Sequence, residues 1–405
     1  MVLALFRRDR MWSAARPLRP RYDVVIVGGG VHGVAIAYEL AKRGIRDVAV
    51  LERAYVGSGA SGRNTAIIRS NYRTEEGVRF YNESLLLYER MSSDLDYNVL
   101  FSQHGHMTFA HTESAIAGLR VRAEANQLNG VDSRVIYPDE IRGLVPALDL
   151  SDRPRFPVLA ALYHPPGGII RHDAVVWAYA RGADRLGVEI HPYTEVTGID
   201  VSEGRVQGVM TTRGRIAAGT VVNATAGWAT TIARMAGVHL PIVTHPLQAL
   251  VTEPLKPFLD KVLVSATLHV YVSQTDRGEL VIGQEIDPYA SYSMRSTLPF
   301  METAARHTLE LLPSVAGVKV LRQWAGICDM TPDFATIMGT VPEVKGFIVD
   351  VGWGTYGFKA APAAALRIAE LIATERTPEI IAPFTVERFA TNELLGEKAA
   401  AAVSH

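Results

Sequence analysis

The chain has 405 residues, of which 48 % are hydrophobic and 20 % charged, the composition of a globular protein long enough for two domains. Its 41 basic and 42 acidic residues nearly cancel, which argues against nucleic acid or an anionic membrane surface as a partner. One cysteine, Cys328, excludes an intramolecular disulfide framework and favours a reducing cytoplasm, and no apolar run reaches the roughly 18 residues that span a bilayer.

Residues 1–21 carry six arginines against one acidic residue. The apolar stretch at their start is too short for the core of a signal peptide, and the charges follow it instead of preceding it. We interpret this segment as a basic arm that is either solvated or laid on a partner chain. Its arginines are Arg7, Arg8, Arg10, Arg16, Arg19 and Arg21.

Residues 23–53 predict a βαβ unit that binds a dinucleotide. The unit opens with a continuous β-branched run, typical of a strand buried on both faces, and three glycines with the spacing G-x-G-x-x-G follow. Gly28 allows the tight turn, Gly30 the approach of a pyrophosphate, and Gly33 the close packing of the next helix. A second buried strand ends at Glu52, where a carboxylate binds the adenosine ribose hydroxyls. The alternative is a βαβ unit with an empty crevice.

The middle of the chain alternates between helical and strand patterns. A glycine-rich loop over 57–65 can direct several backbone N–H groups at a diphosphate or a ring. Residues 99–165 are interpreted as a strand-rich insertion, and the alternation over 241–322 predicts a sheet exposed on one face. We expect helices over 75–92, 113–128 and 174–186, the last capped by Asp173, and strands at 189–190, 196–201, 206–211 and 221–225.

The last predicted unit, residues 347–374, favours a flavin over a nicotinamide cofactor. A buried strand leads through a glycine-rich turn into a helix that contains Pro362, which is tolerated only in a first turn. The helix therefore begins near 358–361 and places Lys359 at its N-terminus, where the macrodipole disfavours a cation unless an anion is bound. Such a helix N-terminus can stabilise negative charge on a reduced ring. The alternative is a surface lysine at an ordinary loop-to-helix joint.

Segments along the whole chain resemble the β subunits of heterotetrameric sarcosine oxidases, amine oxidoreductases of the glucose-oxidase superfamily. These segments are GGGVHGVAIAYELAKRG, GRNTAIIRSNY, RHDAVVWAYARGA, THPLQALV, HVYVSQ, GELVIG, GWGTYGFKAAP and APFTVERF. The resemblance implies an α/β fold with a Rossmann-like FAD-binding domain and a second, α+β substrate domain built on a mixed or antiparallel sheet. We place the first domain at 22–90, 160–235 and 325–390, the second at 91–159 and 236–324, and a C-terminal tail at 391–405.

The resemblance also implies chemistry and partners. FAD would be bound noncovalently, and FMN would be attached to a histidine and shared with a larger α subunit that binds NAD and folate, beside small γ and δ subunits. Sarcosine would be converted to glycine and formaldehyde, or methylenetetrahydrofolate when folate is present, with hydrogen peroxide as the second product. The sequence itself has no histidine and cysteine cluster with metal-site spacing.

A substrate carboxylate in a low-dielectric site requires cations of fixed geometry. Arg69 matches the carboxylate-binding arginine of the family, although it could instead pair with Glu75 or Glu76. A lone histidine on an alternating strand is more often a packing residue. The catalytic residues we expect are Arg69, Lys359, Thr65, Tyr72 and His269. The cofactor contacts we expect are Gly28, Gly30, Val31, His32, Gly33, Glu52, Arg63, Asn64, Thr65, Ile67, Arg171, His172, Val196, Gly354, Gly357 and Lys359.

His172 is the FMN attachment site that the resemblance implies. It opens a predicted helix, whose N-terminus disfavours protonation of the imidazole, so a nitrogen lone pair is available to attack the flavin methyl carbon. Arg171 could bind the FMN phosphate or stabilise negative charge on the ring. The alternative is that His172 is a helix-entry residue bonded to the backbone.

The same superfamily includes monomeric relatives, the monomeric sarcosine oxidases and glycine oxidase, and this chain departs from them at two positions. Those enzymes tether FAD to a cysteine where this chain has Gly326, and we expect the nearby Cys328 to pack as a small hydrophobic residue. They also carry an oxygen-activating lysine where this chain has Val281, so FAD here is expected to react slowly with oxygen and to pass its electrons onward.

Two other classes of function remain open at this point. One is an FAD-dependent oxidase or dehydrogenase of another amino acid, such as proline, dimethylglycine or a D-amino acid. The other is a flavin-binding scaffold subunit whose chemistry lies in a partner. A scaffold needs neither Arg69 nor Lys359, so the presence of both favours an enzyme.

Overall fold

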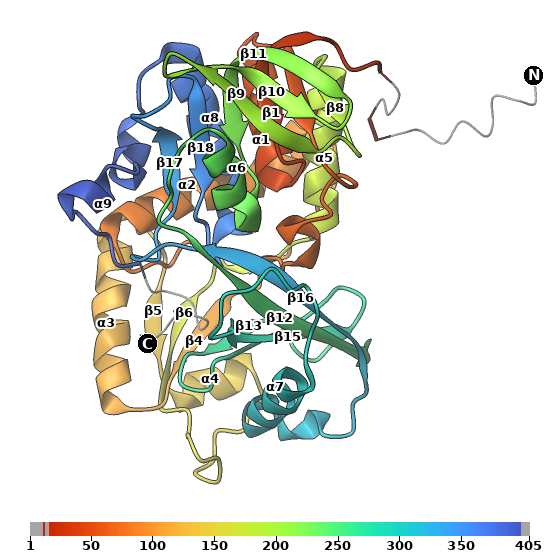
Figure 1. Cartoon of the computed structure of the whole chain (residues 1–405). Helices are drawn as coiled ribbons and strands as arrows, with labels where there is room; N and C mark the ends of the chain where they lie inside the picture. Colours follow the sequence, from red (N-terminus) through yellow and green to blue (C-terminus); the bar gives the residue numbers. More distant parts are fainter. Residues whose placement is uncertain (1–10, 13–15, 398–405) are drawn as a thin grey trace, which may run out of the picture.

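The computed structural model describes residues 11, 12 and 16–397. Within these residues the chain forms two eight-stranded sheets, one above the other in Figure 1, and a small two-stranded sheet, β3 (Ile67–Ile68) with β7 (Gly168–Ile169). The predicted architecture, a largely parallel sheet beside a mixed sheet, is confirmed.

The first sheet is parallel through its centre. β1 pairs in parallel with β2 and β11, and β11 pairs in parallel with β18. In order across the sheet the strands are β17 (Ile337–Thr340), β18 (Phe347–Val351), β11 (Gly214–Asn223), β1 (Arg21–Val27), β2 (Val48–Leu51) and β8 (Glu189–His191), with β10 (Arg205–Thr211) joined to β11 and β9 (Val196–Ser202) to β10.

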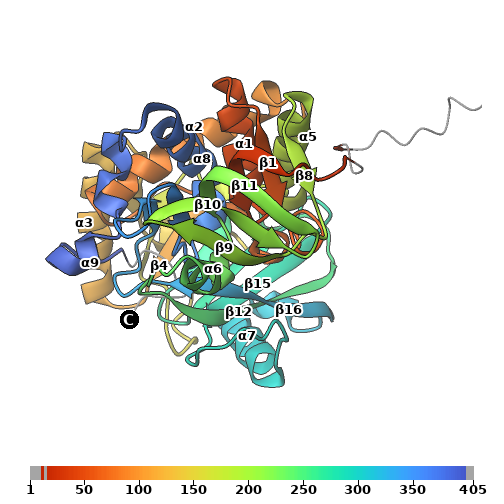
Figure 2. The ribbon, with the colours of Figure 1, turned by 45° about the horizontal axis from the view of Figure 1, so that its top comes forward.

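The continuous apolar run of β1 is explained by cores on both faces of this sheet. Val24 and Ile26 belong to the core beneath the helices, whereas Val25 and Val27 belong to a second core on the opposite face. Each such buried side chain contributes roughly 1.5–3 kcal/mol of transfer free energy. Figure 2 shows the helices behind the sheet and the β9–β10 hairpin in front of it. The helices that cover the first face are α1 (Val31–Lys42), α2 (Glu75–Asp94), α5 (His172–Arg185) and α8 (Gly357–Thr374), and α6 (Ala229–Met235) lies on the other face.

The second sheet is antiparallel except where β13 runs parallel to β4. Its core lies against α7 (Leu298–Leu311) and α4 (Pro138–Leu144), while α3 (Glu113–Leu128) packs on β5 and β6. In order the strands are β16 (Val320–Met330), β12 (Val243–Pro254), β15 (Glu279–Ile286), β14 (Val270–Gln274), β13 (Val262–Ser265), β4 (His106–Ala110), β6 (Ala160–His164) and β5 (Arg134–Ile136). The short α9 (Arg388–Thr391) is the last helix of the described residues.

Two predicted helix starts are wrong by a few residues. α5 begins at His172 with Arg171 as its N-cap. The Asp173 carboxylate does not cap the helix and accepts a hydrogen bond from the Ala174 N–H at 2.9 Å. α8 begins at Gly357, so Pro362 lies in its second turn. Proline has no N–H to give to the carbonyl four residues earlier. The Tyr88 hydroxyl of α2 donates to that carbonyl, on Phe358, and this bond makes the proline tolerable.

The described part of the basic arm contacts its own chain while its arginines stay exposed, so the interpretation of a solvated or partner-bound segment stays a prediction. Arg19 forms ion pairs with Asp47 at 2.5 Å and Glu189 at 3.0 Å, and Arg16 lies 3.8 Å from Asp184. Trp12 and Leu18 pack against the two cores of the first sheet. Carboxylates beside the strand ends thus neutralise these arginines. Arg7, Arg8 and Arg10 lie outside the described residues.

Candidate active site

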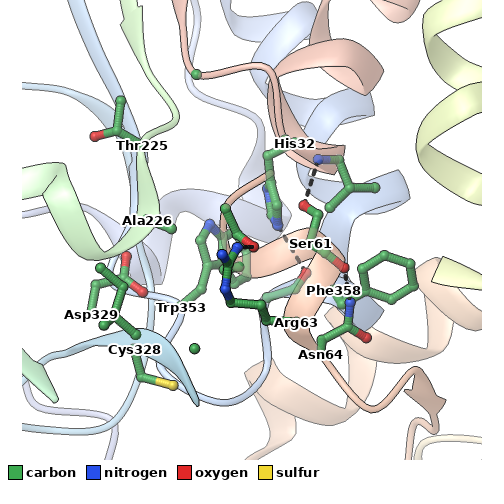
Figure 3. Close-up of a pocket in the computed structure, with 18 of the residues that line it drawn as sticks. His32, Ser61, Arg63, Asn64, Thr225, Ala226, Cys328, Asp329, Trp353 and Phe358 are labelled. Atoms are coloured by element: carbon green, nitrogen blue, oxygen red, sulfur yellow. Dashed lines mark hydrogen bonds between the residues drawn. The ribbon is translucent and has the colours of Figure 1, made fainter. Parts of the chain in front are cut away.

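A cavity of about 450 Å³ lies between the two sheets, where β1, β2 and β11 end. The glycine turn after β1, the loop over 57–65, β12, the end of β16 and the first turn of α8 all contribute to its wall. Figure 3 shows Ser61 and Asn64 on one side of the cavity and Thr225, Ala226 and Asp329 on the other. Two helix N-termini, those of α1 and α8, therefore meet at this cavity and favour bound negative charge.

The first glycine turn is shaped for close approach of a ligand. Gly28 has φ +110°, and a Cβ on Gly33 would lie 1.9 Å from the Gly28 carbonyl oxygen, so only glycine fits both positions. Gly30 lines the cavity next to Val31, and the Val31 N–H donates a hydrogen bond to the Ser61 hydroxyl oxygen at 2.9 Å. This cradle has the form that a pyrophosphate requires.

Glu52 lies at one end of the cavity with its carboxylate held in place. One oxygen accepts from the Gly29 N–H at 2.9 Å and the other from the Ala54 N–H at 2.8 Å. The Arg53 guanidinium stacks 3.7 Å from the centre of the Trp228 ring, and both side chains line the same end. A ribose and a planar base suit these groups, since a fixed carboxylate accepts hydroxyls and a stacked cation offers a flat face.

His32 joins the first and last units of the first sheet. Its Nδ1 lies 2.8 Å from an Asp350 carboxylate oxygen and its Nε2 lies 2.8 Å from the Gly357 carbonyl oxygen. Because both partners are acceptors, the arrangement favours the protonated imidazolium, in which both ring nitrogens donate. Burial alone would lower the pKa of His32, but the Asp350 carboxylate and the Gly357 carbonyl outweigh it and the pKa is raised.

Replacing His32 with glutamine is expected to lower the free energy of unfolding by about 3 kcal/mol at about pH 6, because the Asp350 carboxylate loses its buried partner. The raised pKa means that this stabilisation is complete below the unfolded value of about 6.5 and is lost as the pH rises through the folded value. The difference between variant and wild type should therefore shrink toward about pH 9. Urea denaturation at the two pH values measures it, and an equal difference at both would contradict the charged state.

Two cations, Arg69 and Lys359, line the cavity where the loop after β3 faces the start of α8. Arg69 is 3 % exposed, and its Nη1 donates to the Asn71 carbonyl and amide oxygens at 3.1 and 3.0 Å. The Lys359 ammonium donates to the Thr355 carbonyl at 3.4 Å. Burial, followed by the charge of Arg69, lowers the pKa of Lys359 to about 7. Two cations this close in a buried wall favour an anionic ligand.

Two of the expected catalytic residues, Tyr72 and His269, are not part of the wall of this cavity. Tyr72 is fully buried and stacks on Tyr81 at 3.7 Å, with the Arg69 guanidinium 4.5 Å above its ring, so it supports Arg69 from behind. His269 lies in the turn before β14 with φ +48°, and its Nδ1 is 3.4 Å from Glu285. The alternation that suggested a strand position for His269 continues only from Val270.

Most expected cofactor contacts lie in the cavity wall. They are Gly28, Gly30, Val31, His32, Glu52, Arg63, Asn64, Thr65, Ile67, Val196, Gly354, Gly357 and Lys359. Gly33 packs α1 against β1 instead of touching the cavity.

Arg171 and His172 lie apart from this wall, at the start of α5. The Arg171 guanidinium is 3.1 Å from Asp173 and 4.0 Å from Asp276, so part of its hydrogen-bonding capacity is already used. Burial, then Arg171, lowers the pKa of His172, although Asp173 opposes the shift. The imidazole is therefore neutral at physiological pH, as a nucleophilic nitrogen must be.

Several lining residues were not singled out from the sequence. Ser61 lay within the glycine-rich loop, but its bond to Val31 could not be foreseen from the loop's composition. Burial raises the pKa of Asp329 to about 6 and that of Tyr271 to about 12. The lining residues in this group are Ser61, His106, Trp228, Tyr271, Asp329 and Trp353.

The two departures from the monomeric relatives have different surroundings. Gly326 and Cys328 both line the cavity, and Cys328 also belongs to the core beneath α1. Burial raises the pKa of its thiol strongly, which leaves it an unreactive packing group. Val281 lies on β15 opposite Val251 and Ser273 and is not among the described lining residues.

Neither a metal-binding cluster nor a membrane-spanning helix is found among the described residues. No group of three or more histidine, cysteine or acidic side chains is placed to hold a metal ion. Among the helices of that part of the chain, none combines the length and apolar character needed to cross a membrane.

Comparisons with known proteins agree with this geometry. Residues 23–371 match the family model described as FAD dependent oxidoreductase. The chain is 45 % identical over 396 residues to the sarcosine oxidase subunit beta of Arthrobacter sp, covering 98 % of this chain and 97 % of that protein. It is 43 % identical to the subunit of the same name from Rhodobacter capsulatus, covering 98 % and 95 %. The solved L-proline dehydrogenase from P. horikoshii superposes with a TM-score of 0.88 at 31 % identity, covering 93 % of this chain and 100 % of that one.

Proposed function

The chain belongs to the FAD-dependent oxidoreductases and, within them, to the family of sarcosine oxidase β subunits, and from this premise we propose that it oxidises sarcosine with FAD as the catalytic subunit of a larger complex. The observation that carries the substrate class is the pair of cations, the buried Arg69 and the half-buried Lys359, in the wall of a cavity that also contains a dinucleotide cradle. A small amino acid brings the carboxylate that these cations require.

The residues of the cradle fit FAD. The turn at Gly28–Val31 would hold the pyrophosphate, Glu52 the ribose, and the segments 63–65 and 354–357 the flavin end. FAD supplies a two-electron acceptor when bound. Arg69 and Lys359 fix the substrate carboxylate, so the N-methyl group is oriented and water is excluded while the C–H bond breaks. With Gly326 in the cavity wall and an unreactive Cys328, the cofactor has no thiol tether, which supports noncovalent binding.

The overall reaction balances with oxygen as the final acceptor. Sarcosine, water and O₂ give glycine, formaldehyde and hydrogen peroxide, or methylenetetrahydrofolate in place of formaldehyde when folate is present. We assign the onward electron path to FMN bound covalently at His172, with a larger NAD- and folate-binding α subunit and small γ and δ subunits in a cytoplasmic heterotetramer. The neutral state of His172 and the word subunit in the relatives' names support this assignment.

An anaerobic titration of the purified complex tests the proposed function. Sarcosine should bleach the flavin absorbance, whereas proline, dimethylglycine and D-alanine should bleach it far more slowly at equal concentration. Proline is the most informative competitor, since it is also a secondary amine with a carboxylate and the similar solved structure is a proline dehydrogenase. Faster bleaching by proline would move the assignment to that substrate, and no bleaching by any of them would favour the scaffold alternative.

The pKa of about 7 for Lys359 predicts a pH dependence of anion binding. Lysine is charged below its pKa, so the carboxylate clamp is complete below about pH 7 and loses one cation above it. The inhibition constant of acetate, which has a carboxylate but no amine, should rise above pH 7 by up to about tenfold per pH unit. Lys359→Met should bind acetate weakly at every pH. A wild-type inhibition constant that stays flat from about pH 6 to 9 would contradict the role of Lys359.

A further inference from the structure

His106, the first residue of β4, is a buried histidine in the cavity wall that the proposed function has not used. It is 2 % exposed, and its Nδ1 has no hydrogen-bond partner among the described residues. Its neighbours in the sheet are His164 of β6 and Val262 of β13. A buried polar atom without a partner costs about 1–3 kcal/mol, so this imidazole needs an explanation.

The other buried histidines of the same sheet have ordinary structural roles. His164 accepts from the Ser70 N–H at 3.2 Å and lies 2.6 Å from the Asp132 carbonyl. His111 lies 2.8 Å from both the Phe156 carbonyl and the Ser265 hydroxyl. Neither of them lines the cavity, whereas His106 does and its Nδ1 lacks such a bond among the described residues. The difference indicates that His106 is kept for a partner that enters the cavity.

The surroundings of His106 keep the imidazole neutral. Burial lowers its pKa well below 6.5, and the groups that face it lower it further. Those groups come from four segments: Arg69 after β3, His164 on β6, Arg122 on α3 and Lys359 on α8. On the β13 side, Lys261 is paired with Asp260 at 2.9 Å. A neutral imidazole in a wall of cations has a nitrogen lone pair that can only accept.

The proposed substrate needs such an acceptor. A secondary amine is an ammonium ion at neutral pH, and its C–H bond can be oxidised only after the nitrogen has lost a proton. Arg69 is a donor, and Lys359 is a donor once a carboxylate is bound, so neither is suited to accept this proton. The arriving carboxylate also offsets both cations and thereby makes a nearby imidazole more basic.

We propose that His106 accepts the proton of the substrate ammonium and is a further catalytic residue of the oxidation; this inference rests on the proposed function. The ammonium N–H bond breaks with its electron pair left on nitrogen, and a new N–H bond forms on the imidazole, which takes the positive charge. The neutral amine could then lose a hydride equivalent, which is one methyl proton with the two C–H bonding electrons, to a bound flavin and become an iminium ion, and the imidazolium returns its proton to water on product release.

The test follows anaerobic FAD reduction by sarcosine in the intact complex between about pH 6 and pH 10. General-base catalysis raises a rate by about 10²–10⁴-fold, so sarcosine should reduce the FAD of the His106→Asn variant at least about 100-fold more slowly than that of the wild type at pH 7. Its rate should keep rising with pH as neutral amine becomes available in solution, whereas the wild-type rate should level off at lower pH. His106→Gln provides a second variant of similar shape without a basic nitrogen.

His111→Asn is the matched control, because it changes a buried histidine just after the same strand that lies outside the cavity wall and is not among the groups that lower the pKa of His106. It should lower stability and leave the pH profile of FAD reduction unchanged. FAD content and melting temperature show whether each variant is folded. His106 variants with the wild-type pH profile, or slowed equally at every pH, would overturn the inference alone. Wild-type FAD that sarcosine fails to reduce at any pH would overturn the proposed function as well.

Discussion

Replacing Arg69 with alanine is expected to lower kcat/KM for sarcosine by about 30-fold to several thousandfold, with most of the change in KM. Removing one charged partner of a buried pair costs roughly 2–5 kcal/mol, and Arg69 is only 3 % exposed in the cavity wall. Arg69→Lys should recover part of the loss, since it keeps the charge but not the forked geometry. Steady-state kinetics and FAD content per chain measure the two effects separately, and FAD content should stay near one.

Arg388→Ala is the matched control for this substitution. Arg388 is equally buried, at 3 % exposed, but pairs with Asp333 at 2.8 Å and lies outside the cavity wall. Its loss should lower the melting temperature without a specific rise in the sarcosine KM. If Arg69→Ala kept the wild-type kcat/KM, the assignment of the carboxylate clamp to Arg69 would be wrong.

The dinucleotide cradle could be predicted because its physics is local in the sequence. The apolar run of β1 has no polar alternation because cores lie on both faces of the strand, and the spacing of Gly28 and Gly33 follows from contacts between adjacent turns. Lys359 was also predictable, since a cation at a helix N-terminus with apolar neighbours demands an explanation wherever it occurs.

The residues that the sequence misplaced depend on longer-range contacts. Tyr72 is three residues from Arg69, yet it points into the core because Tyr81 of α2 stacks on it. His269 continues an alternating pattern, yet the chain turns there and the strand starts one residue later. His106 could not be distinguished from His111 by pattern, because only the packing of β4 against the cavity separates their surroundings. The N-cap of α5 falls on Arg171 instead of Asp173, the two-residue uncertainty common at helix ends.

The chemistry proposed for His172 requires a neutral imidazole next to a cation. Burial and Arg171 both lower the pKa of His172, so a lone pair is available to attack the 8α-methyl carbon of FMN at neutral pH. Arg171 shares its guanidinium with Asp173 and Asp276 and keeps a positive charge beside the site. The position at the first residue of α5 adds the positive end of a helix dipole, which favours the anion of a reduced ring or a phosphate.

His172→Ala is therefore expected to abolish covalent flavin while leaving substrate oxidation by FAD intact. After acid precipitation the yellow colour should stay with the wild-type polypeptide and vanish in the variant, and noncovalent FAD should wash out of both. The variant should still bleach its FAD with sarcosine in the absence of oxygen but turn over slowly with oxygen, because electrons lose their onward path. His307→Ala is the control: it removes another half-buried helical histidine whose pKa is lowered by burial, and it should retain the colour. Wild-type flavin that all comes off on precipitation would end the assignment, since a carbon–nitrogen bond to His172 survives acid.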